Sequence, residues 1–206
     1  MIVRVKICGL THAADAVAAA EAGADALGFM FFAGSKRNIS FANAAAIIRE
    51  LPPLLAKVGV FVNAPADEIR RAVDETGIDT LQLHGEEPPE FCAQFSPLKV
   101  VKAFRLRDHA SIHDCQRYPA HAWLLDSFVD GAHGGTGVTV DWDLAAEAVQ
   151  LHRRVILAGG LRVETVAEAV RRVRPFAVDV SSGVESAPGR KDAAKVRAFI
   201  ENVRAA

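Results

Sequence analysis

The sequence is short of cysteine, of net charge and of long apolar runs, and each shortage excludes a class of protein. Its 206 residues include three cysteines, Cys8, Cys92 and Cys115, an odd and widely spaced set that makes a poor disulfide framework. No Cys and His cluster has zinc spacing, so we expect no metal. A formal net charge of −1 gives no field that would recruit nucleic acid. No apolar stretch has the length of a signal peptide or a membrane span, so we expect a cytoplasmic protein with no membrane partner.

What the sequence does contain is an alternation of short apolar runs with longer stretches of helical period. Near-continuous apolar strands are typical of a parallel sheet covered by helices. We predict strands at residues 3–7, 26–31, 57–62, 80–84, 99–104, 122–126, 155–158 and 177–180. We predict helices at residues 13–22, 42–51, 65–76, 89–95, 108–116, 142–150, 163–173 and 192–204, with Thr11 capping the first.

This alternation predicts a single (β/α)8 TIM barrel with parallel strands, one catalytic domain over residues 1–206. An open doubly wound sheet is the structural rival. We favour the barrel because the eight predicted strand–helix units are the number that closes it. The G-x-G-x-x-G motif that is typical of a doubly wound sheet does not follow the first strand.

In a barrel of this kind, polar side chains at the C-terminal ends of the strands face the active site. Cys8 stands where the first apolar strand stops and the loop begins, so we interpret its thiol as a general base. We expect Lys6 and the start of the following helix to lower the pKa of that thiol. The structural alternative is a small buried apolar residue. Cys92 and Cys115 fall within predicted helices, where we interpret them as structural.

Asp126 directly follows the apolar run Trp123-Leu124-Leu125. A carboxyl group beside an apolar wall can have a raised pKa and donate a proton near neutral pH, so we interpret Asp126 as the general acid. The alternative is a carboxylate that caps the following turn.

Glycine and serine follow the seventh and eighth strands, where barrels frequently bind phosphate through backbone N–H groups. Plain turn formation is the alternative. The predicted phosphate-binding residues are Gly159, Gly160, Ser181, Ser182 and Gly183.

Three further residues are candidates for substrate binding. Arg37, in the loop after the second strand, has the geometry to grip a carboxylate with two hydrogen bonds, although a lone loop arginine is commonly a solvated charge. Gln82 and His84, at the end of the fourth strand, are expected to line the pocket. A histidine that only packs the strand end is the equal alternative for His84. The glycine-rich residues 130–137 are interpreted as a lid or as additional phosphate donors.

Ordered motifs extend along almost the whole chain. They stand at residues 6–11 (KICGLT), 35–40, 58–63, 81–85, 125–127, 134–137, 141–142, 158–161, 179–185 and 188–192. This set resembles the motifs of the phosphoribosylanthranilate isomerase family, the tryptophan-pathway enzymes. Mild departures are Lys36 in place of a usual Pro, Val163 and Thr165 in place of Pro and Asn, and Val140 in place of an aromatic residue.

The resemblance implies an aldose–ketose isomerase that carries out an Amadori rearrangement of N-(5-phosphoribosyl)anthranilate to 1-(2-carboxyphenylamino)-1-deoxyribulose 5-phosphate. By that resemblance Asp126 protonates the ribose ring oxygen, Cys8 removes the C2 proton, and Arg37 holds the anthranilate carboxylate. It implies a small-molecule substrate and no cofactor or metal, because the iminium of the substrate is the electron sink. The assembly is left open between a monomer and a homodimer.

Two other functions remain open. One is another sugar-phosphate barrel enzyme, an epimerase or an aldolase, and an aldolase would need a Schiff-base lysine such as Lys6 or Lys102. The other is a non-catalytic barrel that binds a phosphorylated ligand.

Overall fold

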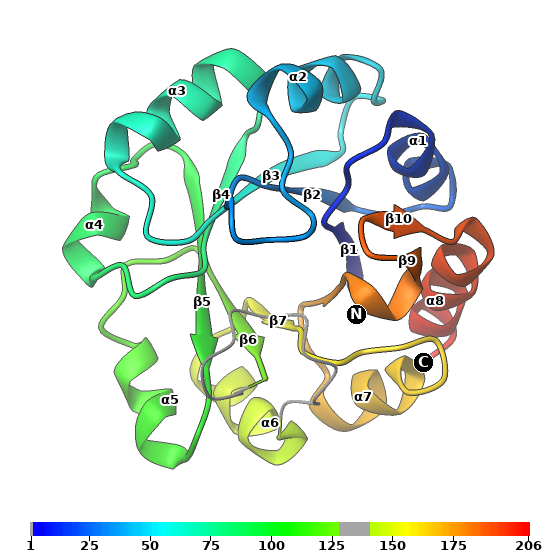
Figure 1. Cartoon of the computed structure of the whole chain (residues 1–206). Coiled ribbons are helices and arrows are strands. Elements are labelled where there is room, and N and C mark those ends of the chain that lie inside the picture. The colour runs from blue at the N-terminus through cyan, green and yellow to red at the C-terminus, as the bar shows by residue number, and fades with distance from the viewer. Residues whose placement is uncertain (1, 128–140) are drawn as a thin grey trace.

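The computed structural model describes residues 2–127 and 141–206, which form a closed barrel of parallel strands ringed by helices (Figure 1). Each strand pairs with its neighbours in the chain, and β1 closes the barrel on β8. The predicted TIM barrel is therefore confirmed, and the doubly wound rival is wrong. The barrel strands are β1 (Arg4–Cys8), β2 (Ala26–Met30), β3 (Ala56–Phe61), β4 (Thr80–Leu83), β5 (Lys99–Arg105), β6 (Ala122–Asp126), β7 (Val155–Leu157) and β8 (Ala177–Val180).

The helices cover the outer face of the barrel and share one core with it. They are α1 (Ala13–Glu21), α2 (Phe41–Arg49), α3 (Ala66–Thr76), α4 (Pro89–Ala93), α5 (His109–Cys115), α6 (Trp142–Leu151), α7 (Val166–Val173) and α8 (Ala193–Ala205). Alternate strand residues such as Ile7, Phe29 and Leu125 are buried in the core that includes the helices. Because side chains alternate across a strand, their neighbours point into the barrel, where Cys8 clusters with Val58 and Val60.

The first turn of α1 has no side-chain cap, whereas the first turn of α5 has one. The prediction that Thr11 caps the first helix is wrong: the N-cap is His12, which makes no side-chain cap bond, and Thr11 Oγ1 donates to Gly189 O at 2.7 Å. By contrast, α5 begins with a complete capping box between Asp108 and Ser111. Thr11 instead ties the loop after β1 to a turn near the C-terminus.

That turn belongs to a hairpin that the sequence analysis did not predict. A 3-10 turn at Ser182–Val184 leads into β9 (Glu185–Ala187) and β10 (Arg190–Lys191), which pair antiparallel between α1 and α8 (Figure 1). Strands of two and three residues carry no readable periodicity. The hairpin is attached to α1 because the Lys191 backbone N donates to Asp15 Oδ2 at 2.9 Å.

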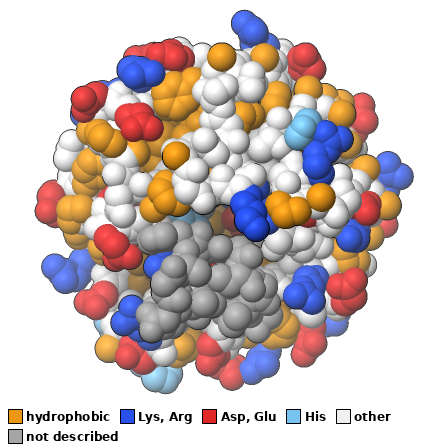
Figure 2. All heavy atoms as spheres, viewed as in Figure 1, with side chains coloured by type: hydrophobic (Ala, Val, Ile, Leu, Met, Phe, Trp, Pro, Cys, Tyr) orange, Lys and Arg blue, Asp and Glu red, His pale blue; other side chains and the backbone are white. Residues whose placement is uncertain are grey.

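The viewed face carries acidic and basic side chains intermixed around its periphery (Figure 2). Within residues 2–127 and 141–206, every helix is too short or too polar to cross a membrane.

Candidate active site

A cavity of about 640 Å³ opens at the C-terminal ends of the strands. Every residue predicted for the site lines it: Cys8, Arg37, Gln82, His84, Asp126, Gly159, Gly160, Ser181, Ser182 and Gly183. The fold thus brings together side chains that lie far apart in the sequence. Among the described residues, no group of three His, Cys, Asp or Glu side chains is arranged to hold a metal ion.

Cys8 ends β1 and is 5% exposed, at the inner wall of the cavity. Gly28 on β2 makes room for it, because a Cβ there would lie 2.7 Å from Cys8 Sγ and 3.2 Å from Lys6 Cε. Lys6 is in turn paired with Asp179 at 2.9 Å inside the barrel. The thiol therefore lies beside a buried ion pair.

The predicted lowering of the Cys8 pKa is wrong. Burial raises the pKa of the thiol, Lys6 opposes this, and the carboxylate of Asp179 adds to it. Since Asp179 neutralises Lys6, the ammonium group cannot outweigh the burial. Cys8 is consequently a thiol at neutral pH in the ligand-free cavity.

Asp126 ends β6 and is 6% exposed. Its Oδ2 lies 3.2 Å from His84 Nε2, and its Oδ1 accepts a hydrogen bond from the Ser127 backbone N at 2.8 Å. Burial raises the pKa of this carboxyl, but His84 and the Ser127 N–H favour the ionised form more strongly, so the pKa lies below its ordinary value. The prediction of a raised pKa is therefore wrong: it considered the apolar wall on the same strand and missed His84, in the loop after β4.

His84 is held from both sides. Gln82 Nε2 lies 2.8 Å from His84 Nδ1, while His84 Nε2 meets Asp126. Gln82 and His84 thus join Asp126 in a line of three polar side chains at the cavity wall.

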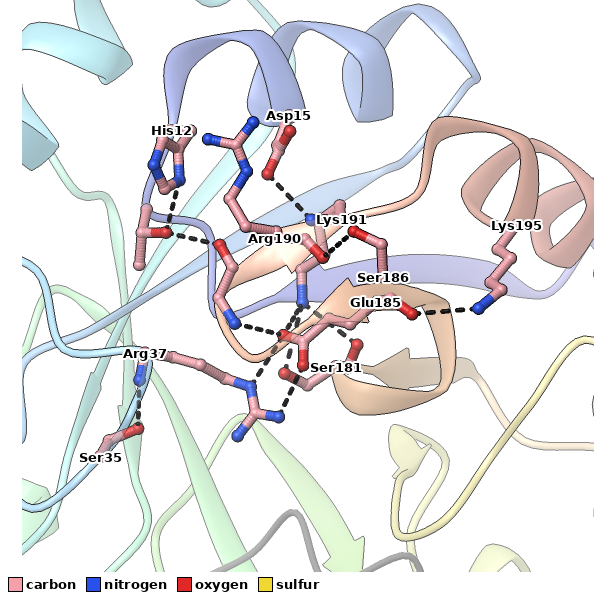
Figure 3. A network of polar contacts seen from close by, with 12 residues as sticks. His12, Asp15, Ser35, Arg37, Ser181, Glu185, Ser186, Arg190, Lys191 and Lys195 are labelled. Carbon is pink, nitrogen blue, oxygen red and sulfur yellow. Dashed lines mark hydrogen bonds and ion pairs between the residues drawn. The ribbon is translucent and has the colours of Figure 1, made fainter.

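Arg37 is held in an ion-pair network, so the alternative of a solvated loop charge is wrong. Its Nε and Nη2 donate to Glu185 Oε1 and Oε2 at 2.8 and 2.7 Å. Figure 3 shows Arg37 reaching from the loop after β2 toward Glu185, which also accepts from Lys191 Nζ at 2.9 Å. The Nε–Nη2 edge of the guanidinium thus makes its two hydrogen bonds to the protein itself.

The same network extends to the loop after β8. Lys191 Nζ donates to Ser181 O at 3.1 Å and lies 3.4 Å from Ser181 Oγ. The Lys191 and Glu185 side chains are 1% and 5% exposed. Burial lowers the pKa of Lys191, and Arg37 and Lys191 together hold the pKa of Glu185 below its ordinary value against its own burial. Sequence reasoning gave neither residue a role, although both stand in motifs around the Pro188-Gly189 turn.

The glycines after β7 and β8 are required by close packing. Gly159 and Gly160 have φ of +75° and +67°, and a Cβ on Gly159 would lie 2.5 Å from Ser127 N. A Cβ on Gly183 would lie 2.0 Å from Leu161 O, so the two loops touch backbone to backbone. This arrangement lets backbone N–H groups approach an oxyanion. Residues 130–137, predicted as a lid or as phosphate donors, lie outside the described residues.

Comparison with known proteins identifies the family. The family described as N-(5'phosphoribosyl)anthranilate (PRA) isomerase matches residues 5–202. The N-(5'-phosphoribosyl)anthranilate isomerase of Geobacter metallireducens is 52% identical over 99% of this chain and 100% of its own length. A crystal structure of monomers generated from the dimeric phosphoribosylanthranilate isomerase of Thermotoga maritima is similar, with a TM-score of 0.89 and 40% identity over 99% of this chain and 100% of the other.

A phosphoribosylanthranilate isomerase crystallised with reduced 1-(o-carboxyphenylamino)-1-deoxyribulose 5-phosphate is equally similar, with a TM-score of 0.89 and 41% identity over 99% of this chain and 100% of that chain. The match extends over nearly the whole chain in both sequence and structure. The chain belongs to the N-(5'-phosphoribosyl)anthranilate isomerase family.

Proposed function

We propose that this chain, as one catalytic domain over residues 1–206, converts N-(5-phosphoribosyl)anthranilate to 1-(2-carboxyphenylamino)-1-deoxyribulose 5-phosphate in tryptophan biosynthesis. The observation that carries the proposal is one cavity lined by a thiol, a carboxyl group, an arginine and two glycine-containing loops. A relative of the same fold binds the reduced form of that product.

The chemistry needs one acid and one base. Asp126 protonates the ribose ring oxygen, the C1–O bond breaks, and the nitrogen lone pair forms an iminium at C1. The Cys8 thiolate removes the C2 proton, and the electrons of that bond move to the iminium to give an enolamine. C1 then gains a proton and the C2 hydroxyl loses one, so the overall reaction is proton-neutral. The iminium accepts the electrons, so neither a metal nor an organic cofactor is required.

The two ends of the substrate have separate subsites in this proposal. The phosphate binds at the Gly159-Gly160 and Ser181-Ser182-Gly183 loops, through backbone N–H groups and serine hydroxyls. The anthranilate carboxylate meets Arg37, and Gln82 and His84 line the wall between the subsites. A cavity of about 640 Å³ is within the usual range for a small-molecule site.

The aldolase alternative needs a neutral lysine that can attack a carbonyl. Lys6 is buried and paired with Asp179, and its pKa is raised because Asp179 and Cys8 together outweigh the effect of burial. Lys102 Nζ donates to Gly85 O at 2.8 Å and pairs with Glu87 at 3.2 Å. Neither ammonium group is placed to become a nucleophile, so the isomerase is favoured.

The proposal includes a cytoplasmic protein that works as a monomer or a homodimer. The dimeric relative from Thermotoga maritima makes the homodimer the form to test first. Sedimentation equilibrium of the purified chain distinguishes the two, since their masses differ by a factor of two.

The decisive experiment is growth rescue of a tryptophan auxotroph that lacks this isomerase, combined with turnover of N-(5-phosphoribosyl)anthranilate by the purified chain. Rescue by the unmodified chain and none by Cys8→Ala supports both the substrate and the base. Turnover of a different sugar phosphate, or tight ligand binding without turnover, would replace the proposal with one of the alternatives.

A further inference from the structure

Gln82, His84 and Asp126 form a hydrogen-bonded line from inside the barrel to the cavity. Gln82 Nε2 lies 2.8 Å from His84 Nδ1, and His84 Nε2 lies 3.2 Å from Asp126 Oδ2. Gln82 is 1% exposed, and the His84 and Asp126 side chains are 11% and 8% exposed. Solvent therefore has little access to the protons along this line.

The order of donors fixes where those protons lie. An amide N–H can only donate, so in this arrangement His84 Nδ1 accepts and Nε2 carries the proton of the neutral ring. Nε2 then donates to Asp126 Oδ2, and the lowered pKa of this carboxyl group favours its ionised form. The line as it stands holds no proton for Asp126 to deliver.

One atom in the line has no partner. Gln82 Oε1 is buried and receives no hydrogen bond from the described residues. An unpaired buried acceptor costs about 1–3 kcal/mol, and such groups in a native structure call for an explanation. Turning the amide by about 180° exchanges Oε1 and Nε2, because the two ends of an amide are nearly identical in shape. Oε1 would then face His84 Nδ1 and accept a proton from it.

We propose that these three side chains are a proton relay, in which His84 stores the proton that Asp126 delivers and Gln82 turns its amide to hold either charge state of the ring. His84 acts through Asp126 and is thus a positioning residue. In the loaded state His84 is an imidazolium: Nδ1–H donates to Gln82 Oε1, and Nε2–H is available to Asp126. The proposal rests on the proposed isomerase reaction.

The protons balance over one turnover. His84 Nε2–H passes its proton to Asp126, which passes it to the ring oxygen as the C1–O bond breaks, and the neutral ring keeps its other proton on Nδ1, where Gln82 Oε1 accepts it. When the enolamine becomes the ketone, the C2 hydroxyl proton returns to Asp126 and reloads His84. Cys8 takes the C2 proton and supplies one to C1.

The surrounding charges act on both ends of the relay. Arg105, at the end of β5, favours ionised Asp126, and its own partner Glu86 lies 3.9 Å away after β4. The buried Lys102–Glu87 pair stands behind the loop that carries His84. On the opposite wall of the cavity are Cys8, the Lys6–Asp179 pair on β1 and β8, and the Arg37 network. The hydrogen bonds of the His84 ring itself are those to Gln82 Nε2 and Asp126 Oδ2.

The test is the pH dependence of kcat/KM for N-(5-phosphoribosyl)anthranilate, in which the relay sets the acid limb, because the acid of the reaction has a lower pKa than the Cys8 base. His84→Gln keeps a donor for Asp126 but cannot store a proton, so we expect the limb to move to lower pH by about one unit or more, with kcat/KM on the plateau about tenfold lower per unit. Gln82→Glu stabilises the imidazolium, so the limb moves to higher pH. The exposed His113→Gln is the matched control and leaves the profile unchanged.

A second measurement does not depend on turnover or on the variants. ¹⁵N NMR of the ring nitrogens in the ligand-free, unmodified protein shows whether the His84 ring is neutral at high pH and gains a second proton as the pH falls. A ring that gains no second proton while the protein stays folded, or an acid limb that stays in place in His84→Gln, overturns the relay. If the unmodified chain fails to turn over this substrate, the proposed function fails, while the NMR result still decides the relay.

Discussion

The surroundings of Cys8 and Asp126 favour the protonation states opposite to those that the proposed reaction requires. Burial raises the pKa of the thiol, while His84 and Ser127 outweigh burial and lower the pKa of the carboxyl. A base must be deprotonated and an acid protonated, so the proposed roles leave only a minority of molecules ready to react at neutral pH. Sequence alone predicted both residues, but Asp179 and His84, which shift their pKa values, come from distant segments of the chain.

The first prediction concerns these two groups. Cys8→Ala and Asp126→Asn each remove a proton-transfer group, so we expect kcat to fall by roughly a hundredfold or more. In the unmodified chain the raised pKa of Cys8 and the lowered pKa of Asp126 oppose each other, because thiolate forms with rising pH while protonated Asp126 is lost, so kcat/KM should change little between the two pKa values. Steady-state kinetics from pH 5 to 10 measure both effects.

Cys92→Ala is the matched control, because Cys92 is buried on α4 and does not line the cavity. It should keep its kcat. A Cys8→Ala variant with near-normal turnover would refute the base assignment.

The second prediction concerns the carboxylate that holds Arg37. Glu185→Gln leaves the Arg37 and Lys191 cations without their shared anion, so Arg37 loses its fixed orientation. We expect KM to rise about tenfold or more with a smaller change in kcat, and stability to fall by about 3 kcal/mol, as for a broken buried ion pair. Substrate kinetics and urea unfolding measure these two effects.

Glu201→Gln, an exposed change on α8, should alter neither quantity. An unchanged KM in Glu185→Gln would mean that Arg37 is oriented without Glu185.

At the scale of elements, periodicity located every helix and strand of the barrel within a few residues. It could not locate β9 and β10, because their pairing depends on a turn and on contacts with α1 and with the loops after β1 and β2. The roles of Glu185 and Lys191 were missed for the same reason. An ion pair between distant segments leaves no signal in the local pattern of either one.

The third prediction concerns the contact between the loops after β7 and β8. A methyl group at residue 183 would meet the Leu161 carbonyl oxygen at 2.0 Å, and backbone cannot move aside as a side chain can. Gly183→Ala should therefore push the loops apart and weaken phosphate binding, raising KM and the inhibition constant of inorganic phosphate together. Competitive inhibition by inorganic phosphate is the direct measurement.

Gly23→Ala is the control for a general loss of backbone freedom. Gly23 has φ of +94° and open space around it, so its substitution should cost about 1 kcal/mol of stability and leave phosphate inhibition unchanged. Normal phosphate inhibition in Gly183→Ala would remove these loops from the phosphate site.

At the scale of the whole molecule, buried ionisable groups limit stability at both ends of the pH range. Glu185 and Asp126 have lowered pKa values in the folded protein, so their contribution is present above the ordinary carboxyl pKa and is lost as the pH falls through the folded values. The thiols act in the opposite direction. Burial raises the pKa of Cys8 and Cys92, and raises that of Cys115 to about 12.

A thiol with a raised folded pKa stabilises the protein fully below the unfolded pKa, near 8.5, and loses that contribution as the pH rises toward the folded value. For Cys115 this window runs from about pH 8.5 to about 12. Within this pH range the Cys115 thiol ionises in the unfolded chain but not in the folded chain. The unfolding free energy therefore falls by about 1.4 kcal/mol per pH unit. Cys115→Ala should thus have a shallower decline in unfolding free energy between pH 9 and 11, measured by urea unfolding. Ile112→Val is the control, because it loses packing on the same helix but no titrating group. Its plot of unfolding free energy against pH should run parallel to that of the unmodified protein. A parallel plot for Cys115→Ala would show that the thiol ionises equally in the folded and unfolded states.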